Sequence, residues 1–258
     1  MSTARMPVVF VGHGSPLNAV EDNEFSRGWT ALARALPRPK AVLCISAHWE
    51  TSGTYATAMA HPRTIHDFYG FPQELYRVQY FAPGAPELAR SVAKLVEGTT
   101  VHTTMEWGLD HGAWSVVRRM YPAADVRVVQ LSLDKSKDAA WHYALGRELS
   151  PLRGKGVLIL GSGNLVHNLQ LVDWEGGPLS WAVDFDALAR EAIQKGDHER
   201  LVHYDELGRT ASLSIPTNEH YLPLLYALGA SDPGEKVRFF NEQVVLGSIS
   251  MRGVVLGE

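Results

Sequence analysis

Two histidines follow two separate apolar runs of the sequence. His13 comes after the run 7–11 and a glycine, and His48 follows the run 41–47. We expect both runs to be strands, because each is a short apolar stretch of strand length. The carboxyl ends of strands in an open α/β sheet line the crevice where ligands bind, and imidazole is the commonest metal ligand. The two histidines therefore predict a metal site at this edge of the sheet.

A third ligand is expected from the segment around Pro216, where a helix over 217–229 is predicted to begin. His220 falls in its first turn and can face a crevice. Glu219 is a competing ligand from the same turn, although a carboxylate there also favours the helix dipole. The spacing of these residues alone does not choose between the two.

His167 follows the predicted strand 156–160 and a turn with two glycines, Gly161 and Gly163. We expect it about one turn into a helix, near the same edge of the sheet. There it can serve as a fourth ligand or as a general acid or base, because an imidazole titrates near neutral pH.

A second histidine between glycines is His111, which follows Asp110, the predicted cap of a helix. It belongs either to the site or to a turn in which its ring bonds the backbone.

The loop 61–72 contains two histidines and three aromatic residues. His66, Phe68 and Tyr69 can form a lid or a pocket wall against a flat apolar substrate, or they can hold down a surface loop. Arg63 can pair with a substrate carboxylate or form a structural salt bridge.

The elements that must position these residues alternate between strands and helices, which predicts an α/β fold with a mainly parallel central sheet flanked by helices. We expect one domain over residues 1–258. Further strands are predicted at 54–59, 126–132, 237–240 and 243–251, and further helices at 24–36, 85–97, 136–149 and 181–195.

Composition excludes several classes of protein. The formal net charge is −4 and no cluster of Lys and Arg is present, so we expect no nucleic-acid partner. No run approaches 18 apolar residues and the N-terminus lacks a signal-peptide pattern, so we expect no membrane partner. Cys44, the single cysteine, is expected to be a buried small hydrophobe and fits a reducing cytoplasm. Four of the 11 histidines have no distinctive surroundings and are expected to have no function: His102, His142, His198 and His203.

Six motifs, in this order, resemble class III extradiol ring-cleavage dioxygenases of the LigB type, and within them the 4,5-DOPA dioxygenase extradiol subfamily. They run from residue 12 to beyond residue 225: Gly12-His13-Gly14-Ser15-Pro16, Ser46-Ala47-His48-Trp49, His66-Asp67-Phe68-Tyr69-Gly70-Phe71-Pro72, Asp110-His111-Gly112-Ala113-Trp114, Gly161-Ser162-Gly163-Asn164-Leu165-Val166-His167-Asn168-Leu169 and Asn218-Glu219-His220-Tyr221-Leu222-Pro223-Leu224-Leu225.

The resemblance implies that His13, His48 and His220 are the metal ligands, with a histidine where the broader superfamily has a carboxylate. It implies an acid–base role for His167, which can also be a fourth ligand, and makes His111 a second active-site histidine. Fe(II) would be the working metal, and Zn(II) can be the ion that is bound. The substrates would be a small catechol and O2, and the protein can be an oligomer.

Two other functions use the same residues. A zinc-dependent ester or amide hydrolase would need the three imidazoles and a bound hydroxide. A non-catalytic binding protein could keep the fold, because fold does not determine function.

Overall fold

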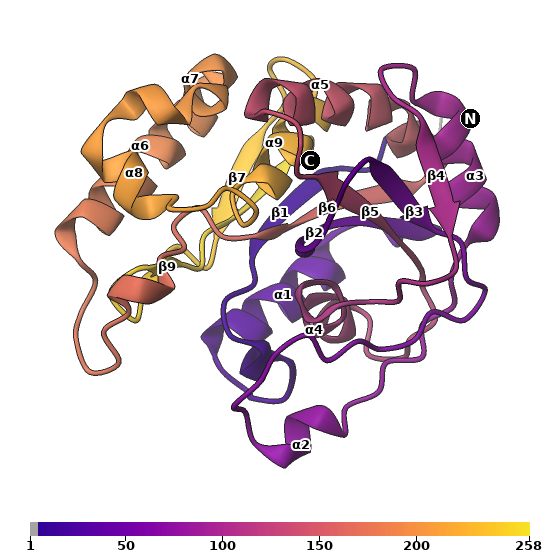
Figure 1. Cartoon of the computed structure of the whole chain (residues 1–258), viewed down its shortest axis with the longest axis horizontal. Coiled ribbons are helices and arrows are strands. Elements are labelled where there is room, and N and C mark those ends of the chain that lie inside the picture. The colour runs from indigo at the N-terminus through magenta and orange to yellow at the C-terminus, as the bar shows by residue number, and fades with distance from the viewer. Residues whose placement is uncertain (1–4) are drawn as a thin grey trace.

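The computed structural model describes residues 5–258, which form an eight-stranded sheet with helices on both faces (Figure 1). In spatial order the strands are β4 (Val101–Thr104), β3 (Thr54–Thr57), β5 (Arg127–Asp134), β2 (Ala41–Thr51), β6 (Val157–Gly163), β1 (Val8–Gly12), β10 (Gly253–Leu256) and β7 (Val237–Phe240). The four central strands, β5, β2, β6 and β1, are parallel. The predicted α/β fold with a mainly parallel sheet is confirmed.

The helices lie on the two faces of the sheet and beside it. They are α1 (Glu24–Ala35), α2 (Gln73–Tyr76), α3 (Pro86–Leu95), α4 (His111–Met120), α5 (Ala139–Leu149), α6 (Ser180–Lys195), α7 (His198–Val202), α8 (Arg209–Ser214) and α9 (Leu222–Ala230). Short 3-10 helices occur at Pro16–Ala19, Ser150–Lys155, Leu169–Leu171 and Tyr204–Leu207. Within the described part of the chain, no helix combines the length and the apolar character needed to cross a membrane.

The central strands are apolar on both faces because both faces are buried. Val8 and Phe10 of β1 face one hydrophobic core, which α5, α6 and α9 cover, while Val9 and Val11 face a second core under α1 and α4. Cys44 of β2 is buried in the second core, as expected for a small hydrophobe. The strands are thus held from both sides, which makes their carboxyl ends a rigid platform.

The predicted strand over 243–251 is wrong. That stretch contains two strands of two residues each, β8 (Val244–Val245) and β9 (Ile249–Ser250), which pair with each other. Leu246 and Gly247 between them have positive φ angles, which turn the chain back on itself. The strand that follows them in the chain, β10, belongs to the central sheet, where it pairs antiparallel with β1.

Candidate metal centre

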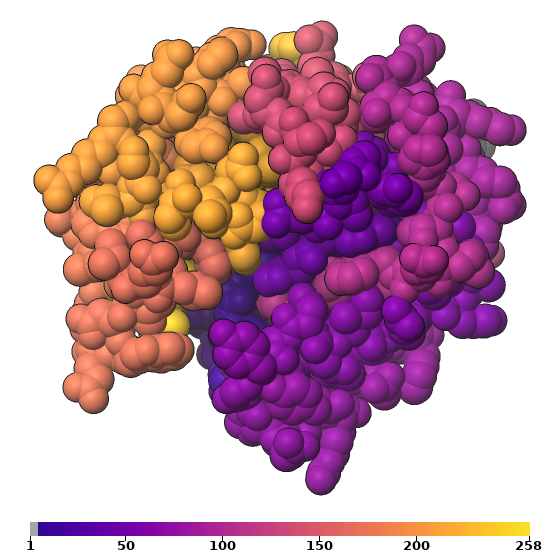
Figure 2. Space-filling model, in the orientation of Figure 1, coloured from indigo at the N-terminus to yellow at the C-terminus, as the bar shows by residue number. Residues whose placement is uncertain are grey.

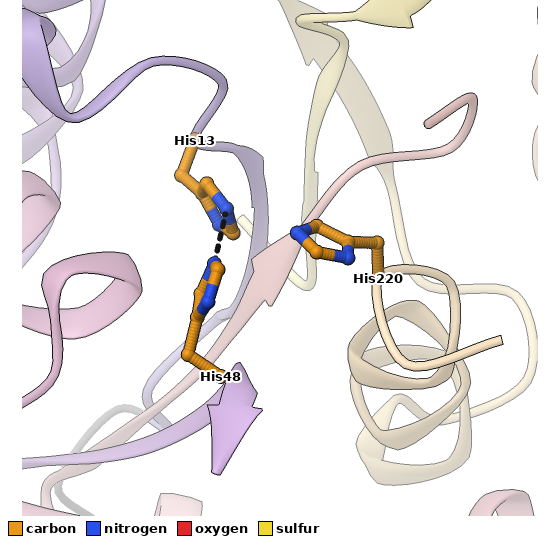
Figure 3. Close-up of side chains that lie close together, drawn as sticks. All are labelled: His13, His48 and His220. Carbon is orange, nitrogen blue, oxygen red and sulfur yellow. Dashed lines mark hydrogen bonds between the residues drawn. The ribbon is translucent and has the colours of Figure 1, made fainter. Parts of the chain in front are cut away.

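Three histidines from distant parts of the chain meet at the carboxyl ends of the central strands (Figure 3). His13 follows β1, His48 lies on β2, and His220 lies in the turn before α9. One ring nitrogen from each lies within 4.8 Å of the others, and the Nε2 atoms of His13 and His48 are 3.1 Å apart. The structure therefore brings together the three residues predicted as metal ligands.

Close contacts with the end of β6 position both His13 and His220. The His13 backbone N–H donates to the carbonyl of Gly163 at 2.9 Å, which extends the β1–β6 ladder by one residue. A Cβ atom on Gly163 would collide with the carbonyl oxygen of His220. Glycine at this position therefore allows the His220 turn to rest directly on the end of β6.

The apolar run predicted that His48 follows the end of its strand. Instead, β2 continues to Thr51, so His48 lies within the strand. The register between β2 and β5 shifts between Ile45 and Glu50. Irregularities of this kind bend a strand and re-aim its side chains. His48 lies within the shifted segment, and its ring points toward His13 (Figure 3).

The helix predicted over 217–229 begins only at Leu222, so His220 precedes it. The backbone N–H groups of Tyr221 and Leu222 both donate to the Asn218 carbonyl, which closes a tight turn around His220. Pro223 lies in the first turn of the helix, where proline is favoured because that position needs no N–H donor. Pro223 rather than Pro216 therefore marks the helix start.

A hydrogen-bond chain determines the tautomer of His13. The Ser162 hydroxyl donates to the Gly112 carbonyl at 2.6 Å and lies 3.1 Å from His13 Nδ1. A serine hydroxyl has one hydrogen, so Ser162 can only accept from His13. Nδ1 of His13 thus carries the hydrogen, and its Nε2 keeps a free lone pair.

Carboxylates favour the same tautomer, with the hydrogen on Nδ1, in His220 and His48. His220 Nδ1 donates to Glu219 Oε1 at 2.9 Å. His48 Nδ1 lies 3.3 Å from Asp67 Oδ2, close enough for the carboxylate to favour a hydrogen on that nitrogen. Glu219, which the sequence offered as a competing ligand, therefore accepts a hydrogen bond from the His220 ring. Such acceptors orient the histidine ligands of metals in many proteins.

The donor set fits a transition-metal ion. Burial and the neighbouring histidines hold the pKa of His13 and that of His220 well below their ordinary value, and lower the pKa of His48 to about 3. All three rings are thus neutral at pH 7. The two Nε2 atoms at 3.1 Å share one hydrogen at most, and a cation that replaced this hydrogen would be held by a lone pair from each ring.

His167 does not lie in a helix, so that prediction is wrong. Its segment pairs with the chain around β9: Ser250 N–H donates to the Val166 carbonyl, and His167 itself forms a bridge with Ile249. These bonds occupy the backbone groups that a helix would need. The His167 ring nevertheless reaches the site, where it stacks on His220 with 3.5 Å between ring centroids.

His111 is also brought to the site, on the first residue of α4. Asp110 caps this helix by accepting from the Ala113 N–H at 3.0 Å, as predicted. The His111 ring centroid is 3.9 Å from that of His48. Its Nδ1 donates to a carboxylate, Asp67, at 3.0 Å and not to a backbone carbonyl, so the alternative of a turn histidine bonded to the backbone is wrong.

Of the aromatic loop, Phe68 approaches the site and Tyr69 does not. The Phe68 ring meets the His111 ring edge to face, with 5.6 Å between centroids. Tyr69 is 92% exposed.

The other two residues predicted on the substrate side make bonds within the fold. His66 Nε2 donates to the Val78 carbonyl at 2.9 Å, and the Arg63 guanidinium donates to the Glu106 carbonyl at 2.6 Å. Both side chains therefore help to hold the loop in place.

A groove opens beside this region on the molecular surface (Figure 2). The segment around residues 165–180, in salmon, forms one side, and the segment around residues 60–80, in purple, forms the other. Atoms of the N-terminal part of the chain, in indigo, lie at its base. The segments on its two sides carry His167 and Phe68.

Comparisons with known proteins identify the family of the chain. Residues 7–256 match the family model described as the catalytic LigB subunit of aromatic ring-opening dioxygenase. A protein of Escherichia coli (strain K12) named 4,5-DOPA dioxygenase extradiol is 49% identical, over 100% of this chain and 97% of its own length. A protein of Beta vulgaris with the same name is 38% identical, over 90% of this chain and 89% of its own length.

A solved structure has the same fold. It is a crystal structure described as an uncharacterized protein from Escherichia coli K12, with a TM-score of 0.86, 43% identity, and coverage of 98% of this chain and 100% of that chain. Nothing in these comparisons favours the zinc hydrolase alternative. The chain therefore belongs to the LigB family and is an aromatic ring-opening dioxygenase of the extradiol type.

Proposed function

We propose that the chain binds Fe(II) through His13, His48 and His220 and cleaves the ring of a DOPA-like catechol with O2. The observation that carries the metal assignment is the convergence of three neutral imidazoles whose Nδ1 atoms each face an acceptor. The names of the E. coli and Beta vulgaris relatives support the substrate class.

Iron is favoured over zinc by the chemistry and not by the ligands, since imidazole suits both ions. When bound, Fe(II) would let the catechol and O2 exchange electrons, whereas zinc has no redox chemistry. Zinc remains an ion that the same three nitrogens can hold.

The chain's own residues can supply the proton transfers. A catechol must lose a proton from a hydroxyl before its oxygens bind a metal well, and His111 can accept it at Nε2 because its Nδ1–H is held by Asp67. We assign to His167 the proton transfers at the substrate oxygen on the other side of the site, beside His220. Phe68 forms an apolar wall next to His111.

The test is reconstitution with Fe(II) under anaerobic conditions, followed by addition of air and a panel of catechols with and without an amino-acid side chain. We expect oxygen uptake matched by a yellow ring-opened product, with the highest kcat/KM for DOPA-like members of the panel. Zinc-loaded protein should be inactive. Turnover with zinc in the absence of oxygen would overturn the iron assignment, and equal rates across the panel would overturn the substrate class.

A further inference from the structure

Asp67, which lies in the loop that carries Phe68, is in contact with two histidines of the site at once. Its Oδ2 atom accepts from His111 Nδ1 at 3.0 Å and lies 3.3 Å from His48 Nδ1. Its Oδ1 atom accepts from the His111 backbone N–H at 2.8 Å. One carboxylate therefore faces a metal ligand and a non-ligand histidine.

The shared oxygen constrains both rings in the same way. A carboxylate only accepts hydrogen bonds, so His111 Nδ1 carries a hydrogen and His111 Nε2 keeps its lone pair. At 3.3 Å the same oxygen favours a hydrogen on His48 Nδ1, which would leave His48 Nε2 free to bind an ion. His48 Nε2 lies 3.1 Å from His13 Nε2, on the side where the ion would lie. The lone pair of His111 Nε2 is left as the proton acceptor.

We propose that Asp67 is a positioning residue that holds His48 and His111 in the tautomer the reaction needs. The proposal rests on the roles assigned above to these two histidines. It also makes the aromatic loop a part of the metal centre, because the residue that orients the ligand lies next to Phe68 in the chain. The alternative is that Asp67 only anchors this loop to the start of α4.

The first measurement needs no variant. Zinc-loaded protein is diamagnetic, so the imidazole nitrogens can be observed by 15N NMR. We expect His48 and His111 both to carry the hydrogen on Nδ1. Finding it on Nε2 of either ring would overturn the proposal, whatever the activity of the enzyme.

The second measurement uses Asp67→Asn, with Glu74→Gln as the matched control. Glu74 is exposed on α2, close along the chain, and its substitution removes the same charge. An amide cannot replace both carboxylate oxygens as acceptors, because one end of it is a donor. We expect zinc affinity, measured by chelator competition, to fall 10- to 100-fold in Asp67→Asn, and kcat of the iron enzyme to fall with KM within about twofold.

If Asp67 only anchors the loop, Asp67→Asn should raise KM and leave zinc affinity unchanged. That result would overturn the proposal. The effects should also separate in a His111→Ala background. There Asp67→Asn should still weaken zinc binding, through His48, but should lower kcat by less than it does when His111 is present. The zinc and NMR measurements do not depend on turnover, so they test Asp67 even if the substrate assignment fails.

Discussion

The imidazole of His167 lies flat against that of His220, with 3.5 Å between ring centroids and 9° between the planes. The nitrogens of His13, His48 and His220 lie within 4.8 Å of one another, and His167 is not part of that group. We therefore propose that His13, His48 and His220 would hold the ion and that His167 has an acid–base role rather than that of a fourth ligand.

Replacing His167 with phenylalanine keeps a flat ring against His220 and removes the proton-carrying nitrogens. We expect metal affinity to change by less than about threefold, while kcat falls by about 10²–10⁴, the usual contribution of a positioned acid or base. Metal affinity follows from chelator competition and kcat from oxygen uptake. His203→Ala, at an exposed histidine, is the control. Loss of the metal in the phenylalanine variant would instead identify His167 as a ligand.

Gly163→Ala should displace His220, because the new Cβ would collide with the His220 carbonyl oxygen. We expect metal affinity to fall at least tenfold and the free energy of unfolding to fall by about 1–3 kcal/mol, as for other overpacking substitutions. Gly177→Ala is the control, since a Cβ there has open space. Urea titration and chelator competition measure the two effects, and wild-type affinity in Gly163→Ala would contradict the role of this contact.

Removing the metal should abolish turnover and lower the melting temperature together. An ion that binds only the folded chain stabilises it by about 2.7 kcal/mol at a concentration 100 times its Kd. Zinc and Fe(II) should both restore the melting temperature, which calorimetry can follow, while only Fe(II) restores oxygen uptake. Restored activity with zinc would contradict the redox role of the ion.

Phe68→Ala and Tyr69→Ala form a matched pair in one loop. Phe68 packs against His111, whereas Tyr69 is 92% exposed. We expect a several-fold higher KM for the catechol in Phe68→Ala and little change in Tyr69→Ala, both read from steady-state kinetics. A larger effect at Tyr69 would mean that the loop moves onto the substrate during turnover.

His142 should make stability depend on pH away from the metal site. It is fully buried in α5, its Nδ1 lies 3.0 Å from the Tyr226 hydroxyl, and burial lowers its pKa to about 4. The unfolded chain binds this proton from about pH 6.5 downward, whereas the folded chain resists it until about pH 4. Burial of this group therefore leaves the free energy of unfolding unchanged above pH 6.5 and lowers it by up to about 3 kcal/mol as the pH falls.

His142→Gln keeps a partner for Tyr226 without a titrating group. Urea titrations between pH 7 and pH 4 should show a shallower loss of stability in this variant than in the wild type. Parallel curves for the two proteins would contradict the assignment.

The parts of the site that sequence reasoning located are those that follow directly from the parallel strands. His13 and His48 come after apolar runs, and parallel strands deliver such residues to one edge. His220 was predicted in the first turn of a helix, but it lies in the turn that the Asn218 carbonyl closes, just before the regular helix begins at Leu222.

The parts that it missed depend on contacts between distant segments. The helix expected at His167 is replaced by pairing with Ile249, more than 80 residues later, and local spacing contains no sign of that bond. Asp67 stands beside His66 in a recognised motif, yet nothing in the spacing connects it to His48 or His111. The one sequence feature that hints at this role of Asp67 is a carboxylate within an aromatic loop.

The three proposed metal ligands are far apart in the sequence. His13 follows β1, His48 lies on β2 35 residues later, and His220 lies in the last third of the chain. Before the sheet forms, bringing them together would mean closing very long loops, whose entropic cost grows with length. We therefore expect that an ion does not nucleate folding here, as it does in small zinc modules with neighbouring ligands. The chain is expected to fold first, on its two apolar cores, and to bind its metal afterwards.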